Sequence, residues 1–184
     1  MQFSLRAKFF SIIALILFGI VVRLLPHTPN VTPVSAIALL VSVYFGFRSS
    51  FASMVIIMLI SDFFIGFYTL PIMFSVYGSF VFVSLLGRFP ESPSIEAIVV
   101  RTLASSLIFF IITNFAVWQF GTMYPHSPQG LLESYFMAIP FFKSSLIGDL
   151  LYTGLLFGVF YILTHKEILL NKVYNYYYAL KRAN

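Results

Sequence analysis

The chain lacks cysteine and has very few charged residues. Of its 184 residues, 11 are Lys or Arg and 6 are Asp or Glu, which makes 9% charged and 60% hydrophobic. A water-soluble domain carries about a quarter charged residues, so this composition excludes a soluble enzyme, a disordered tail and an extracellular disulfide scaffold. The absence of cysteine also removes thiolate metal sites and cysteine nucleophiles. We therefore expect the chain to fold in a lipid bilayer.

The formal net charge of +5 needs a membrane interpretation as well. In a soluble protein such an excess could indicate nucleic-acid binding. In a membrane protein, Lys and Arg set orientation and contact anionic lipid headgroups. We therefore predict membrane lipids, and not nucleic acid, as partners of the basic residues.

Apolar runs divide the chain into membrane-spanning segments. A spanning helix needs about 20 mostly apolar residues. Cutting the chain where charges, Pro and Gly cluster gives six segments, at approximately 9–25, 33–47, 51–68, 71–87, 102–120 and 144–164. This pattern predicts an all-α fold, with residues 1–184 forming a single integral membrane domain of six transmembrane helices in a compact bundle.

Two further segments are too short or too polar to span. Residues 131–142 are interrupted by Pro140, so we expect them to lie along the outer interface or to fold back as a lid. The Tyr-rich segment 166–184 reads as an interfacial cytoplasmic tail. Ala38, Ser42 and Gly46 form a small-residue stripe that favours close helix packing.

The basic residues give the orientation. With both termini cytoplasmic, nine of the 11 fall on the cytoplasmic side: Arg6, Lys8, Arg48, Arg88, Arg101, Lys166, Lys172, Lys181 and Arg182. The two others, Arg23 and Lys143, fall at the opposite ends of their spans. The distribution predicts a multi-pass protein of the bacterial plasma (inner) membrane with both termini inside.

Four polar side chains within the predicted spans converge on one depth of the bilayer. Counting about 1.5 Å per residue from the cytoplasmic ends places Asp62, Asn114, Asp149 and Arg23 toward the outer half of the bilayer. An ionised carboxylate in hydrocarbon costs several kcal/mol or more, so such groups face a protein interior or a wet cavity and need partners. Intramembrane ionisable residues are therefore the first candidates for a functional site.

Helical spacing shows what surrounds these residues. Ser145, Asp149 and Tyr152 follow i, i+4 and i+7 and share one helix face. Asn114 and Trp118 are four residues apart, which places a hydrogen-bonding amide beside an aromatic ring that could stack on a planar ligand. We interpret these faces as walls of a pocket.

The outer connections add polar groups at the same end. His27 and Asn30 lie in a proline-stiffened loop between the first two spans. Tyr124, His126 and Lys143 are candidates for the outer mouth. The predicted ligand-binding residues are therefore Arg23, His27, Asn30, Asp62, Asn114, Trp118, Asp149 and Tyr152.

Each candidate also has a structural interpretation. Asp62 or Asp149 could form a buried ion pair with Arg23 or Lys143. Trp118, Tyr124 and Tyr152 could be interface-belt aromatics. His27 and His126 are better explained as hydrogen-bonding loop residues than as metal ligands, because no His or carboxylate lies at metal-binding spacing from either. We predict no metal and no cofactor.

Several segments resemble a known type of protein. They are Arg23–Leu39, Ser61-Asp62, Tyr124-Pro125, Ile139–Phe142 and Leu146–Thr153. These segments resemble a family of small bacterial membrane proteins that is similar to the substrate-binding S components of energy-coupling factor (ECF) vitamin transporters. The resemblance implies a six-helix bundle that captures a vitamin-like or modified-base-like molecule from outside. It also implies an ECF T component with ATPases as possible partners, since the chain has no Gly-x-x-x-x-Gly-Lys-Ser/Thr phosphate loop.

Three functions are compatible with these residues. The first is uptake of a small molecule in the manner of an S component. The second is an intramembrane enzyme that uses Asp62 and Asp149 as an acid/base pair on a lipid or prenyl substrate, although no catalytic motif is present. The third is an assembly subunit without a ligand. The two acids favour a ligand with cationic or donor groups, whereas Arg23 and Lys143 leave an anionic group equally open.

Overall fold

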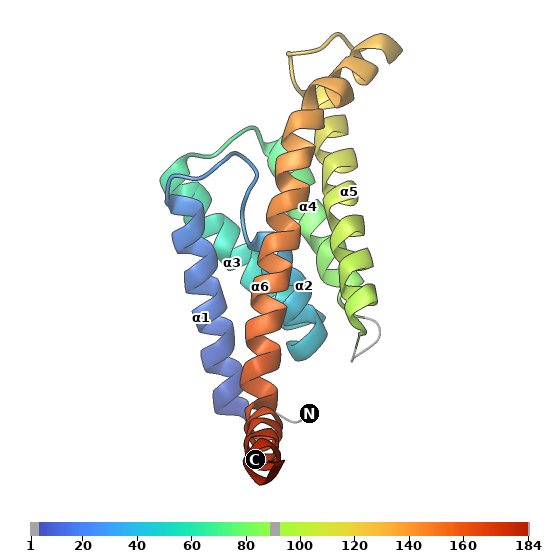
Figure 1. Ribbon diagram of the computed structural model, residues 1–184. Coiled ribbons are helices and arrows are strands. Elements are labelled where there is room, and N and C mark those ends of the chain that lie inside the picture. The colour runs from blue at the N-terminus through green and yellow to red at the C-terminus, as the bar shows by residue number, and fades with distance from the viewer. Residues whose placement is uncertain (1–3, 89–92, 184) are drawn as a thin grey trace.

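The protein is a bundle of helices (Figure 1). The computed structural model describes the backbone of residues 4–88 and 93–183, and side chains as far as residue 165. The described chain forms six helices: α1 (Leu5–Leu24), α2 (Val34–Phe45), α3 (Phe47–Ile65), α4 (Leu70–Leu86), α5 (Ile95–Phe120) and α6 (Pro128–Ala183). The all-α prediction is confirmed.

The shortest helix, α2, lies at the centre of the bundle. It packs against each of the other five helices, and every residue from Val34 to Val43 is buried. This burial follows from its composition, because α2 is apolar around its whole circumference apart from two serines. Its 12 residues measure only about 18 Å, yet its backbone meets protein instead of lipid.

The lengths of the helices support four of the six predicted spans. Four of the described helices are long and apolar enough to cross a membrane: α1, α3, α5 and the Pro128–His165 part of α6. The helices α2 and α4, with 12 and 17 residues, fall short of that length. In α2 the physical reason is its enclosure, because a helix surrounded by other helices need not match the thickness of lipid.

The last helix differs most from the prediction. Residues 131–142 were expected as a separate outer segment before a span at 144–164, but α6 is continuous from Pro128 through Pro140 to Ala183. A proline removes one backbone donor, which here leaves the Phe136 carbonyl without its helical partner, yet apolar membrane helices tolerate such a loss. The predicted interfacial character of 166–184 concerns side chains outside the described residues.

The fifth helix begins earlier than predicted. It starts at Ile95 and not near residue 102, because Ser94 caps it and accepts a hydrogen bond from the Ala97 amide at 3.3 Å. The serine cap lets Arg101 lie inside the helix. The added turns make α5 long enough to pack along both α4 and α6.

Small residues allow α2 to approach α3 and α4 closely. The Ser42 hydroxyl donates to the Ser84 carbonyl at 2.5 Å, and the Ser50 hydroxyl donates to the Ala38 carbonyl at 2.6 Å. A side-chain carbon at Gly87 would lie only 2.9 Å from the Leu39 carbonyl oxygen. The predicted packing role of the α2 stripe is therefore confirmed for Ala38 and Ser42, which face inward.

The two ends of the bundle differ in character. The beginning of α1 and the end of α6 lie at one end, together with the α2–α3 connection, the end of α4 and the start of α5 (Figure 1). The connections 25–33, 66–69 and 121–127 lie at the other, which we call the loop end. Arg6, Lys8, Arg48 and Arg88 therefore lie far from the loop end, while Arg23 lies close to it.

Candidate functional site

The loop end of the bundle contains a cavity of about 420 Å³. It lies beneath the first loop, and all six described helices contribute to its lining. The residues that line it are Arg23, His27, Asn30, Thr32, Ser35, Met58, Ile65, Tyr68, Val76, Phe80, Phe109, Ser145 and Asp149. Four of the predicted ligand-binding residues, Arg23, His27, Asn30 and Asp149, are thus brought together by the fold.

A second cavity of about 230 Å³ adjoins the first. The two cavities share one wall, which is formed by Asn30, Val76, Phe109 and Ser145. The second cavity extends between α4, α5 and the first half of α6, where Asn114 contributes the amide. Together the two cavities have the size of a small-molecule site.

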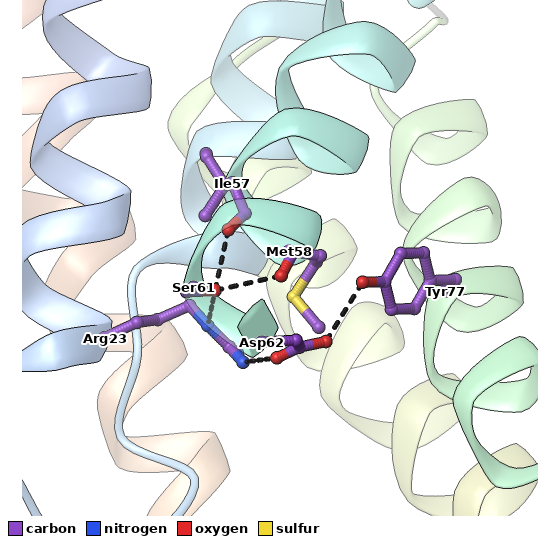
Figure 2. A network of polar contacts seen from close by, with 6 residues as sticks. All are labelled: Arg23, Ile57, Met58, Ser61, Asp62 and Tyr77. Carbon is purple, nitrogen blue, oxygen red and sulfur yellow. Dashed lines mark hydrogen bonds and ion pairs between the residues drawn. The ribbon is translucent and has the colours of Figure 1, made fainter. Parts of the chain in front are cut away.

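Arg23, which lines the first cavity, forms an ion pair with Asp62. Figure 2 shows this pair and its neighbours. The Arg23 guanidinium of α1 donates through Nη2 to Asp62 Oδ1 of α3 at 2.5 Å, and through Nε to the Ser61 hydroxyl at 2.7 Å. The Tyr77 hydroxyl of α4 donates to the other carboxylate oxygen at 3.0 Å. The Ser61 hydroxyl donates onward to the Ile57 carbonyl at 2.6 Å, which fixes its orientation.

This network joins three helices and occupies Asp62 fully. The Asp62 side chain is 2% exposed, whereas Arg23 is 15% exposed and reaches the cavity wall. Both carboxylate oxygens have partners, and Asp62 lines neither of the two cavities. The geometry matches the structural ion pair that the sequence left open, with Arg23 and not Lys143 as the partner.

The second carboxylate has a different environment. Asp149 of α6 is 5% exposed and lines the first cavity. The Ser106 hydroxyl of α5 donates to its Oδ2 at 2.7 Å, and the Ser35 hydroxyl of α2 also interacts with it. Within the described side chains, Asp149 forms no ion pair with Lys, Arg or His. It is therefore a buried carboxylate held by hydroxyl groups alone.

The first loop rests on α6 at Gly148, next to Asp149 in the chain. Asn30 adopts a left-handed backbone with φ of 65°, which Asn tolerates better than most residues. The turn is closed by the Val31 amide, which donates to the Thr28 carbonyl at 3.0 Å. A side-chain carbon at Gly148 would lie 3.1 Å from the Val31 backbone, so glycine allows this loop to rest on α6. The loop forms part of both cavity walls.

The remaining candidates lie outside the first cavity. The Asn114 amide donates to the Phe110 carbonyl at 2.8 Å and lines the second cavity. The Trp118 indole donates to the Pro125 carbonyl at 3.0 Å, and its ring meets His126 edge-on at a centroid distance of 6.0 Å. Trp118 lines neither cavity and instead anchors the α5–α6 loop.

Tyr152, Tyr124 and Lys143 likewise line neither cavity. The Tyr152 ring packs edge-on against Phe18 of α1 at a centroid distance of 6.2 Å. Lys143 is exposed and Tyr124 half-buried at the loop end. His27 is exposed, and its Nδ1 lies 2.6 Å from the Leu25 carbonyl oxygen. In the described part of the chain, no group of three His, Asp or Glu residues could hold a metal ion.

Sequence reasoning missed several residues at the site. Ser106, which donates to Asp149, lies eight positions before Asn114 and thus on the same broad stripe of α5, which is a usable signal. Ser145 was placed on the Asp149 face but not assigned to the site. Tyr68 lies two residues after Gly66, in the α3–α4 loop. Partial burial and, to a smaller extent, the nearby Asp62 carboxylate raise the pKa of its hydroxyl to about 12, while the positive charge of Arg23 opposes this rise. No local pattern marks Tyr68.

The chain belongs to a protein family of unknown function, DUF6580, which it matches over residues 3–172. Comparisons with curated proteins and with solved structures found no match. None of the comparisons names ECF S components, so that resemblance stays a prediction from the sequence.

Proposed function

We propose that this protein captures a small polar molecule from the extracytoplasmic side of a bacterial plasma membrane, in the manner of an S component. The observation that carries the proposal is the cavity at the loop end, where Asp149, Asn30 and Arg23 meet aromatic walls. Pockets that hold small molecules are mostly apolar with a few placed polar groups, and this one fits that description.

The proposed topology has six crossings with both termini in the cytoplasm. At the end of the described bundle opposite the loop end, the basic residues are Arg6, Lys8, Arg48, Arg88 and Arg101. A cytoplasmic location of this end agrees with the positive-inside rule. The α4 helix, at 17 residues, measures about 26 Å and can cross a slightly thinned bilayer. With α2 enclosed, the loop end and its cavity then face the outside.

The separation of the two carboxylates favours uptake over an intramembrane enzyme. An acid/base pair requires both groups at one substrate, but Asp62 is bonded to Arg23 and Tyr77 while Asp149 faces the cavity. An assembly subunit explains the Arg23–Asp62 pair but gives no reason for the cavity next to it, which contains a buried carboxylate. Uptake accounts for both features.

Energy for transport would come from partners. The resemblance to S components suggests an ECF T component and its ATPases, and membrane lipids surround the exposed apolar faces of the helices. The inward-facing stripe of Ala38 and Ser42 is occupied by α3 and α4, so a docked partner would need another surface, such as the exposed side of α1 near Ala7.

Native mass spectrometry of gently purified protein tests the proposal. Ser145→Phe would place an aromatic ring in the space of the two cavities, because Ser145 is buried in the wall that they share. Ser144→Phe is the matched control, since the neighbouring residue lines neither cavity. We expect a retained small molecule in the wild type and the control, and its loss in Ser145→Phe.

Ligand-dependent thermal stability gives a second measurement. A molecule that binds the native state raises stability by RT ln(1 + [L]/Kd). A broad vitamin and nucleobase screen should therefore identify a compound that raises Tm in the wild type and in Ser144→Phe, but not in Ser145→Phe. The proposal is refuted if no molecule is retained and no compound raises Tm, or if both variants respond as the wild type does.

A further inference from the structure

The charged groups around the first cavity do not balance. Arg23 is paired with Asp62, so these two side chains cancel one another. Asp149 lines the same cavity without an ion-pair partner among the described side chains, and Lys143 points into neither cavity. His27 has its Nδ1 close to the Leu25 carbonyl in the exposed loop. The cavity is therefore left with one uncompensated carboxylate.

Burial makes this imbalance costly. Asp149 is 5% exposed, and an isolated carboxylate in a low-dielectric interior is strongly unfavourable unless it is paired. The hydroxyls of Ser106 and Ser35 satisfy part of its hydrogen-bonding capacity but bring no positive charge. A cation that enters the cavity would supply the missing charge.

The walls of the cavity suit such a cation. The rings of Tyr68, Phe80 and Phe109 line the same cavity as Asp149. Aromatic faces attract a positive nitrogen through the negative potential of the ring. A cavity lined by a carboxylate and by aromatic rings is thus suited to an ammonium or a cationic heterocycle.

We propose that the ligand is a small organic cation whose positively charged nitrogen lies against Asp149, with its less polar part extending toward the second cavity. This inference rests on the proposed uptake function and names the class of its substrate. It removes the ambiguity of the sequence, where Arg23 left an anionic ligand equally open. Because Asp62 already neutralises Arg23, an anion would meet the unpaired charge of Asp149 and be repelled.

Three aromatic probes of similar size but different charge test the inference. Benzylammonium, benzyl alcohol and benzoate share a ring and differ in charge at neutral pH. Their binding is measured by equilibrium dialysis against the full chain in lipid nanodiscs, with empty nanodiscs correcting for partition into lipid. We expect benzylammonium to bind about tenfold or more tightly than benzyl alcohol, and benzoate to bind most weakly.

Two variants locate the effect. Asp149→Asn keeps the shape and the hydrogen bonds to Ser106 but removes the charge, so it should lower benzylammonium affinity about tenfold or more and leave benzyl alcohol unchanged. Glu133→Gln removes one negative charge at the loop end outside both cavities and should change neither affinity. The charge series on the unaltered protein remains informative if Asp149→Asn does not fold.

The outcomes separate this inference from the proposed function. If benzyl alcohol or benzoate binds as well as benzylammonium, and Ser145→Phe abolishes that binding, the uptake site stands and the cation preference is overturned. The same holds if Asp149→Asn leaves benzylammonium affinity unchanged. If no probe of any charge binds the wild type above empty nanodiscs, the cavity is not a binding site, and the inference falls together with the proposed function.

Discussion

Removing either member of the Arg23–Asp62 pair should destabilise the protein, but by unequal amounts. Arg23→Met leaves the Asp62 carboxylate, 2% exposed, with the Tyr77 hydroxyl as its remaining side-chain donor. Asp62→Asn leaves the Arg23 guanidinium, which is 15% exposed and lines the cavity, where water can reach it. The more deeply buried charge is therefore the more damaging one to leave unpaired.

The magnitudes follow from the burial of each group. Breaking a buried pair costs about 3–5 kcal/mol when an uncompensated charge stays buried, which we expect for Arg23→Met. Asp62→Asn retains a polar acceptor for Tyr77 and leaves a hydratable cation, so about 1–2 kcal/mol is expected. The double variant should be less destabilised than the sum of the two, with a coupling free energy of about 1–3 kcal/mol.

Reversible unfolding in mixed detergent-lipid micelles, followed by far-UV circular dichroism, measures these free energies. Arg48→Met is the matched control, because Arg48 is exposed at the other end of the bundle and should change stability by less than about 0.5 kcal/mol. Additive single-variant effects would show that the two residues are not coupled. An Asp62→Asn variant less stable than Arg23→Met would refute the burial argument.

Three further predictions concern packing, the outer loop and orientation. Gly87→Ala should destabilise the protein by about 1–3 kcal/mol in the same unfolding assay, because the added carbon meets α2. Gly78→Ala, with open space around it, should be neutral or stabilising by up to about 1 kcal/mol; equal effects would contradict the packing. Trp118→Phe should lower the free energy of unfolding by about 0.5–1.5 kcal/mol, because the hydrogen bond to the Pro125 carbonyl is lost. The same variant should be cleaved faster by proteases within residues 121–127. An unchanged cleavage rate would show that the indole does not hold this loop. Because the chain has no cysteine, single Thr28→Cys and Arg48→Cys variants can be labelled with an impermeant maleimide; intact cells should label only the first, and the reverse pattern would invert the topology.

The sequence was informative about helices and weak about partners. Apolar runs located all six helices of the described chain, because a lipid-facing helix must be apolar over most of its length. The continuity of α6 was missed because Pro140 was read as a break, which is the correct rule in water but not in an apolar helix. The start of α5 was missed because Arg101 was read as a boundary.

For the site, the sequence identified the polar residues but not which of them pair. The sequence identified Asp62 and Asp149 as intramembrane acids, and it left Arg23 and Lys143 as possible ion-pair partners of either one. Which acid Arg23 meets depends on how α1 packs against α3, which no single helix pattern contains. Trp118 was placed in the pocket from its spacing to Asn114, but its indole donates to the α5–α6 loop. Tertiary packing decided each of these cases.

The enclosure of α2 bears on how the chain is inserted during its synthesis. At about 18 Å, this helix is shorter than the hydrocarbon layer of about 30 Å. If it crossed the membrane alone, the polar backbone groups of the segments that flank it would be exposed to lipid. Only Gly46, with φ of 88°, separates it from α3, which favours entry of the two helices as one hairpin. Two of its neighbours, α5 and α6, are translated last. A ribosome-bound chain that ends before them leaves α2 partly uncovered, and such unfinished chains are the form that membrane quality-control proteases should recognise.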